Sequence, residues 1–137
     1  MEIFDPLRKK YVKRTPEEEV RQQIISWLNY EIGVPMTLMM SEYSFIFNGL
    51  QFRSDIVIFD KKPEPIMFVE CKAPSIKLNK KVVDQIIRYN MVLKVLYILI
   101  SNGKTSYLCE WNESKGHYEF VKDIPTYNIM LESKEKK

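Results

Sequence analysis

Two uninterrupted apolar segments with a helical pattern between them constrain the fold of this chain more than any other feature. Residues 66–72 and 95–100 are apolar on both faces, apart from the charged end of the first segment, which is typical of strands at the centre of a sheet. Residues 78–93 carry apolar side chains at helical spacing. A strand, a helix and a strand in succession normally pair in parallel through a right-handed crossover. The sequence therefore predicts an α/β fold with a mixed β-sheet.

The first half of the chain predicts a helix followed by a β-hairpin. Thr15 is a suitable N-cap and Gly33 a suitable stop, with apolar residues at helical spacing between them. Residues 37–47 and 52–59 are rich in β-branched and aromatic side chains, and Asn48-Gly49 between them is a strong hairpin signal. Two further strands are expected at 105–111 and 117–121. The N-terminal helix and the crossover helix would then both pack on the sheet.

The length of 137 residues, 45% of them hydrophobic, fits one compact domain. We expect this domain to span residues 15–125, after a basic N-terminal arm at 1–14. The arm would either contact phosphates or simply be solvated. Residues 126–137 are expected to form a charged C-terminal tail, disordered from Glu132 onwards.

Composition excludes several classes of protein. Cys71 and Cys109 have no zinc-binding or CxxC spacing, so we expect a reduced, cytoplasmic protein. The most apolar stretch, 91–100, is far shorter than the roughly 20 residues that cross a bilayer, so no membrane association is expected. The single histidine, His117, gives little support to a catalytic triad or a zinc site.

A Glu-x-Lys triplet stands out by its position at the end of a buried strand. The triplet occurs four times, beginning at Glu70, Glu113, Glu132 and Glu135. Only Glu70 ends an apolar strand, where strand alternation places Glu70 and Lys72 on one side and Cys71 on the other. Charges at such a position are unfavourable unless they are paired or bind a metal. A buried Glu–Lys salt bridge is the structural alternative.

Asp55 strengthens the functional interpretation because its strand, 52–59, is expected beside the strand of Glu70. Two carboxylates supply the hard oxygen ligands that suit Mg²⁺ or Mn²⁺, and Lys72 would contact a metal-bound water. Glu42, on the preceding strand, would either lie near this site or, as we expect, face solvent.

Both predicted helices offer further candidates. Glu17 shares the apolar stripe of the first helix and so would face the sheet, although stabilisation of the helix N-terminus explains it equally well. Gln85 and Tyr89 lie four residues apart on the second helix, beside its packing surface. They would line the same cleft or serve as ordinary boundary residues.

These residues together resemble the N-terminal nuclease domain of type I restriction enzyme R subunits, within the PD-(D/E)xK superfamily. The resemblance covers roughly residues 15–111 and rests on the order and spacing of five motifs. They are Thr15-Pro16-Glu17-Glu18 with Val20-Arg21-Gln22, Arg53-x-Asp55, Val69-Glu70-Cys71-Lys72-Ala73-Pro74, Gln85-x-x-x-Tyr89-Asn90 and Ile100-Ser101-Asn102-Gly103.

The resemblance implies a restriction-endonuclease-like core that holds Mg²⁺ or Mn²⁺. The implied metal ligands are Glu17, Asp55, Glu70 and the backbone carbonyl of Cys71. Lys72 would orient or deprotonate the attacking water. Four further residues would contact nucleic acid or support the active site: Gln85, Tyr89, Arg53 and Arg88. Ser54 stands where the superfamily name has proline.

The sequence thus predicts a metal-dependent DNA nuclease with Asp55, Glu70 and Lys72 as its catalytic core. The chain has no GxxxxGK[ST] loop, so we expect no ATP-driven motor and a module that is excised or stands alone. Its expected partners are DNA and restriction-modification subunits. Homodimerisation would allow both strands to be cut, but no residue identifies a dimer interface. The alternative is a nuclease-fold domain that binds nucleic acid or a protein without cutting.

Overall fold

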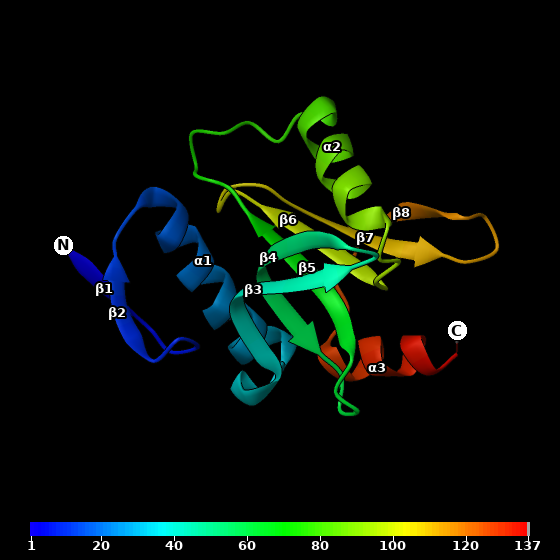
Figure 1. Cartoon of the computed structure of the whole chain (residues 1–137), viewed down its shortest axis with the longest axis horizontal. Helices are drawn as coiled ribbons and strands as arrows, with labels where there is room; N and C mark the ends of the chain where they lie inside the picture. The colour runs from blue at the N-terminus through cyan, green and yellow to red at the C-terminus, as the bar shows by residue number, and fades with distance from the viewer. Residues whose placement is uncertain (137) are drawn as a thin grey trace.

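A computed structural model describes residues 1–136 of the chain, as eight strands, three α-helices and two short helical turns (Figure 1). None of the helices in this part of the chain has the length and apolarity that crossing a lipid bilayer requires. The elements in chain order are β1 (Glu2–Asp5), β2 (Lys10–Lys13), α1 (Pro16–Trp27), the π-helical turn η1 (Leu28–Ile32), the 3₁₀ turn η2 (Met36–Leu38), β3 (Met39–Phe47), β4 (Leu50–Phe59), β5 (Pro65–Cys71), α2 (Lys80–Met91), β6 (Tyr97–Ser101), β7 (Ser106–Asn112), β8 (His117–Val121) and α3 (Tyr127–Glu135).

The main sheet contains six strands in the order β3-β4-β5-β6-β7-β8. β5 and β6 pair in parallel, with Val69 opposite Leu99, and α2 connects them. The other neighbouring strands pair antiparallel. The predicted mixed sheet and crossover helix are therefore confirmed. The two central strands are buried along most of their length, because helices cover both faces of the sheet.

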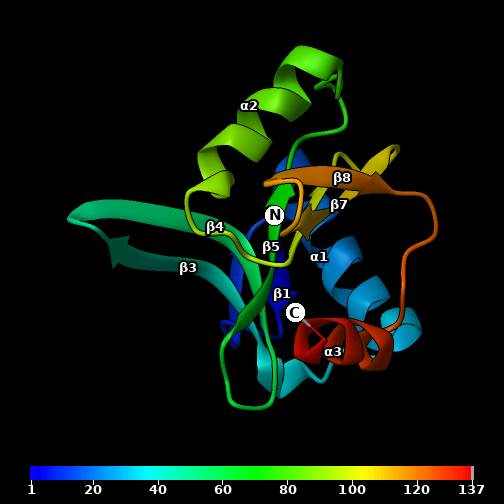
Figure 2. The same cartoon turned by 90° about the vertical axis from the view of Figure 1, so that its right-hand side faces the viewer.

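Helices lie on both faces of this sheet (Figure 2). On one face, α1 and α3 pack over a core that includes Ile25, Leu28, Ile56 and Leu99, all fully buried. On the other face, α2 packs over a second core around Val57, Phe68 and Ile98. The chain is thus a three-layer α/β sandwich in which the central strands are covered from both sides.

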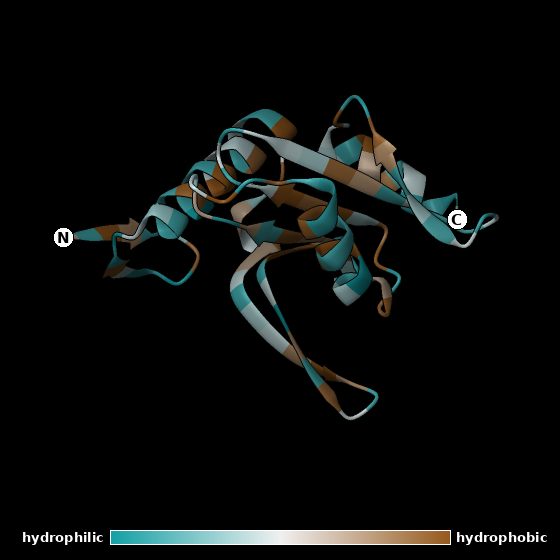
Figure 3. Ribbon diagram, turned by 90° about the horizontal axis from the view of Figure 1, so that it is seen from above, coloured by the Kyte–Doolittle hydropathy of each residue, from teal (hydrophilic) through white to brown (hydrophobic). Residues whose placement is uncertain are grey.

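Local sequence signals explain where α1 and the β3–β4 hairpin begin and end. The Thr15 hydroxyl accepts a hydrogen bond from the Glu18 amide at 3.1 Å, which caps α1. Gly33 ends the helical segment with a φ of +87°, a conformation that glycine adopts without strain. Asn48 and Gly49 also have positive φ and turn the chain between β3 and β4, as their sequence predicts. The tip of this hairpin projects from the body of the domain (Figure 3).

The segment predicted as a basic N-terminal arm, residues 1–14, is folded. Residues 2–13 form the β1–β2 hairpin, with Glu2 opposite Lys13. Its turn is held by Arg8, which pairs with the fully buried Asp5 and, at 2.8 Å, with Glu18 of α1. Sequence reasoning missed this hairpin because one of the ion pairs that hold it, Arg8–Glu18, is made with a helix that follows it in the chain.

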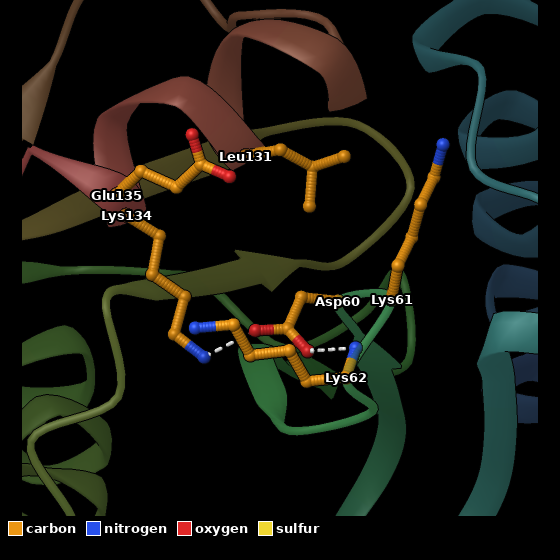
Figure 4. Close-up of a pocket in the computed structure, with 6 residues that line it drawn as sticks. All are labelled: Asp60, Lys61, Lys62, Leu131, Lys134 and Glu135. Carbon is orange, nitrogen blue, oxygen red and sulfur yellow. Dashed lines mark hydrogen bonds and ion pairs between the residues drawn. The ribbon is translucent and has the colours of Figure 1, made fainter.

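The prediction of a disordered charged tail is wrong. Residues 127–135 form α3, which buries Tyr127 and Met130 against the core, with 2% and 0% of their surface exposed. Lys134 pairs with Asp60, which lies between β4 and β5 (Figure 4). Charged residues at the end of the chain therefore anchor the helix, and its apolar positions drive its docking. Lys137, the last residue of the predicted tail, lies outside the described residues.

The burial of Met130 makes α3 a testable part of the core. We expect Met130→Ala to lower the free energy of unfolding by about 2–4 kcal/mol, because it leaves a cavity beneath the helix. Ile129, its neighbour on α3, is half exposed, so Ile129→Ala should change stability by less than about 1 kcal/mol. Urea denaturation of both variants measures the difference. Equal effects would show that α3 is not docked on the sheet.

Candidate active site

An open cavity of about 440 Å³ lies where α1, β4, the end of β5 and α2 meet. Seven of the residues singled out from the sequence line it together with Ile86: Glu17, Arg53, Asp55, Glu70, Lys72, Gln85 and Tyr89. Arg88 does not line this cavity. It lies in a neighbouring depression on α2, which shares Gln85 with the main cavity. The topology thus brings together residues from four elements that are far apart in the sequence.

The register of β4 against β5 places Asp55 beside the end of β5. Ile56 is paired with Val69, so the next positions along the two strands are Asp55 and Glu70. The Asp55 carboxylate reaches across, and its Oδ2 accepts a hydrogen bond from the Cys71 amide at 2.7 Å. This bond joins the two strands beyond the last pair of the ladder and fixes one oxygen of Asp55.

Glu70 and Lys72 point to the same side, as strand alternation predicts. The Lys72 ammonium lies 3.5 Å from Glu70 Oε2, and the two side chains are 34% and 25% exposed. The Lys72 amide donates to the carbonyl of Ser101 on β6, which holds the residue in place just after β5 ends. The Glu–Lys pair is therefore open to the cavity and is not sealed inside the core.

The two carboxylates are electrostatically strained. Burial raises the pKa of Glu70 to about 7, and the negative charge of Asp55 adds to this rise. Burial also raises the pKa of Asp55, although the Cys71 amide and the Arg21 guanidinium act in the opposite direction. The positive charge around the two carboxylates is thus too small to offset their burial and their repulsion of each other. An additional cation between them would therefore bind favourably.

Cys71 contributes to the site through its backbone alone. Its side chain is fully buried in the core beneath α1. Burial raises the pKa of its thiol well above the ordinary value, which disfavours the thiolate that a cysteine nucleophile needs.

Arg21 belongs to the site, although the sequence analysis assigned it no role. Its side chain is 5% exposed and lies between α1 and β3. Nε is 3.6 Å from Glu18, Nη2 is 3.4 Å from Glu42 and 4.0 Å from Asp55, and Nη1 is 3.3 Å from the Ser41 hydroxyl. The only sequence signal was its place within the first motif, on the buried side of α1.

Glu42 is not the solvent-facing strand residue that its position suggested. It interrupts the β3–β4 ladder at the position opposite Asp55, with a φ of +51°. A non-glycine residue pays a conformational cost there, on the order of 1 kcal/mol. Its carboxylate pairs with three arginines: Arg53 at 2.8 Å, Arg8 at 3.3 Å and Arg21 at 3.4 Å. The strained backbone thus places an acid at the centre of an arginine cluster.

The remaining predicted residues form the rim of the cavity. Glu17 is exposed in the first turn of α1, and its charge contributes to the raised pKa of Glu70. The Arg53 side chain is 60% exposed beside Glu42. On α2, the Tyr89 ring packs on Phe52 with a centroid distance of 5.4 Å. Hydrogen-bonding and positively charged groups therefore surround the carboxylate pair.

The donor set fits a hard divalent cation held by few protein ligands. Within residues 1–136, no three side chains of His, Cys, Asp or Glu form a ready-made metal cluster. Mg²⁺ commonly binds through one or two carboxylates and keeps several waters. Asp55 and Glu70, on adjacent strands and facing a cavity large enough for waters, meet that requirement.

The six-stranded mixed sheet, with helices on both faces and an acidic pair where β4 lies beside the end of β5, defines a protein of the restriction-endonuclease-like fold class. Comparison with known families agrees. The family model described as "Type I restriction enzyme R protein N terminus" matches residues 16–125. The chain belongs to this family.

A solved structure supports the fold. It is described as a fragment of a putative HsdR subunit of a type I restriction enzyme from Vibrio vulnificus YJ016, and it matches with a TM-score of 0.58 at 18% sequence identity. The match covers 85% of this chain and 24% of that one, so this chain spans about a quarter of its length. Among curated proteins, no match was found.

The raised pKa of Glu70 predicts how stability depends on pH. Between its ordinary value of 4.5 and about 7, the folded state binds more protons than the unfolded state, so stability falls as pH rises. We expect Glu70→Gln to match wild type at pH 4.5 and to be more stable at pH 8, by roughly 1–3 kcal/mol. Urea denaturation across this range measures the effect. A less stable variant at pH 8 would favour the structural Glu70–Lys72 salt bridge instead.

Proposed function

We propose that this domain hydrolyses phosphodiester bonds in DNA with the help of Mg²⁺ or Mn²⁺, as a nuclease of the PD-(D/E)xK type. The observation that carries the proposal is the pair of half-buried carboxylates, Asp55 and Glu70, facing an open cavity with Lys72 beside them. Family membership supports it, because a restriction enzyme subunit acts on DNA.

Asp55 and Glu70 would hold the cation, with Glu17 and the backbone carbonyl of Cys71 as the further ligands that the family resemblance implies. A bound divalent cation would lower the pKa of its water and polarise the phosphoryl oxygen. Asp55 suits this role because its Oδ2 is fixed by the Cys71 amide, so its other oxygen has a defined position.

Lys72 would act on the reacting groups directly. Its ammonium faces the cavity 3.5 Å from Glu70, where it can donate a hydrogen bond to the attacking water or to a phosphate oxygen. Positive charge at this place stabilises the negative charge that develops in the transition state. A lysine at a half-buried strand end, facing a cavity, supports this catalytic role.

The rim residues would position the DNA. Arg53 presents an exposed guanidinium, which suits bidentate contact with a phosphate. Gln85 and Tyr89 offer an amide and a hydroxyl on the opposite wall, and Arg88 extends the positive surface along α2. Restriction-modification subunits are the proposed protein partners. The localisation that fits this role, and the reduced cysteines, is the cytoplasm.

Cleavage of supercoiled and linear DNA in the presence of Mg²⁺ or Mn²⁺ tests the proposal. We expect Lys72→Ala and Asp55→Ala each to reduce the rate by at least about a hundredfold, because Lys72 would stabilise charge in the transition state directly and Asp55 would hold the cation that does so. Lys115→Ala is the matched control, since Glu113-x-Lys115 is the same triplet in the turn between β7 and β8. If wild type does not cut, or the variants at positions 55 and 72 cut equally well, the nuclease proposal fails and a non-cleaving binding domain becomes the better account.

Metal binding gives a test that does not depend on activity. Calorimetric titration with Mn²⁺ should show binding that tightens as pH rises through about 7, because Glu70 must lose its proton before it can bind the ion. Asp55→Asn should abolish this binding while leaving the fold intact. Binding that is unchanged in that variant, or independent of pH, would place the ion elsewhere.

A further inference from the structure

Arg21 is a buried cation whose hydrogen bonding is incomplete. Its side chain is 5% exposed. Among the buried side-chain nitrogen and oxygen atoms of residues 1–136, Arg21 Nε alone has no hydrogen-bond partner. A buried donor without a partner costs stability, on the order of 1–3 kcal/mol. Stability alone therefore gives a weak reason for an arginine at this position, because apolar side chains often replace buried ion pairs without loss.

The acids around Arg21 depend on it to different degrees. Glu18 also pairs with Arg8 at 2.8 Å and accepts from Gln22 at 2.9 Å. Glu42 also pairs with Arg53 at 2.8 Å and with Arg8 at 3.3 Å. Removing Arg21 leaves both of these acids with a cation in contact.

Asp55, unlike Glu18 and Glu42, has no second cation in contact with it among the described residues. Within the described part of the chain, its one ion pair within 4 Å is with Arg21, at 4.0 Å between Oδ1 and Nη2. The other oxygen, Oδ2, is bound by the Cys71 amide. Asp55 is thus held from two sides, by β5 on one oxygen and by α1 on the other.

Arg21 Nη2 lies 4.0 Å from Asp55 Oδ1, which is too far for a hydrogen bond. The guanidinium therefore attracts this oxygen without occupying its lone pairs. The guanidinium itself is fixed by Glu18, Glu42 and Ser41. Oδ1 is therefore oriented and still available to a ligand in the cavity.

From this arrangement we infer that Arg21 is a positioning residue that holds the carboxylate of Asp55 in its orientation toward the cavity. That this orientation matters for cleavage rests on the proposed function. The orientation itself is independent of the proposed function, because it can be measured in the metal-free protein.

The experiment compares Arg21→Met, Arg21→Lys and Arg8→Met by ¹H–¹⁵N NMR. Arg8 is the matched control, because it pairs with the same two acids, Glu18 and Glu42, but not with Asp55. The resonance of the Cys71 amide reports the hydrogen bond to Asp55, and Asp55→Ala marks its position when the bond is absent. We expect Arg21→Met to move this resonance toward the Asp55→Ala position, Arg21→Lys to move it less, and Arg8→Met to leave it in place.

Kinetics with DNA supplies the second readout. Arg21→Met should lower kcat by about tenfold to a hundredfold with little change in KM, because a misplaced group mainly affects the chemical step. If wild type has no nuclease activity, the proposed function fails but the amide resonance still decides the role of Arg21. An unmoved resonance in Arg21→Met would overturn the inference, as would an equal shift in Arg8→Met. If Arg21→Met does not fold, Arg21→Lys decides, and an unmoved resonance in that variant overturns it.

Discussion

The hydrogen bond from the Cys71 amide to Asp55 is the contact on which the rest of the site depends. It forms where the ladder between β4 and β5 ends, and it brings one carboxylate beside another at a place where water is partly excluded. Burial there raises the pKa of Glu70 to about 7, and repulsion by the neighbouring charge of Asp55 adds to this rise. The sheet thus holds its acids in an arrangement that lowers the stability of the fold and that a bound cation would relieve.

The charges around the pair are arranged in two groups. Lys72 lies beside Glu70 and faces the cavity, whereas Arg21 lies behind Asp55 and is buried. Glu18 and Glu42 hold Arg21, and Arg8 joins the same two acids to the β1–β2 hairpin. The hairpin that precedes the family-matched segment is therefore tied to the periphery of the site and does not contact Asp55 through Arg8.

Much of the fold could be predicted because its signals are local. The apolar strands β5 and β6, the turn at Asn48-Gly49 and the cap at Thr15 each follow from adjacent residues. The convergence of Asp55, Glu70 and Lys72 follows from strand alternation and a short turn. Contacts between distant segments could not be predicted in this way. The docking of α3, the strained backbone at Glu42 and the place of Arg21 beside Asp55 depend on tertiary packing.

The proposed function requires Asp55 and Glu70 to bind a divalent cation together. Anomalous diffraction from crystals grown with Mn²⁺ tests it most directly, because the signal locates the ion without assumptions about ligands. We expect a peak within bonding distance of an oxygen of each carboxylate. A peak that touches neither carboxylate, or a cavity in which Arg21 and Lys72 close onto the acids and exclude the ion, would contradict it.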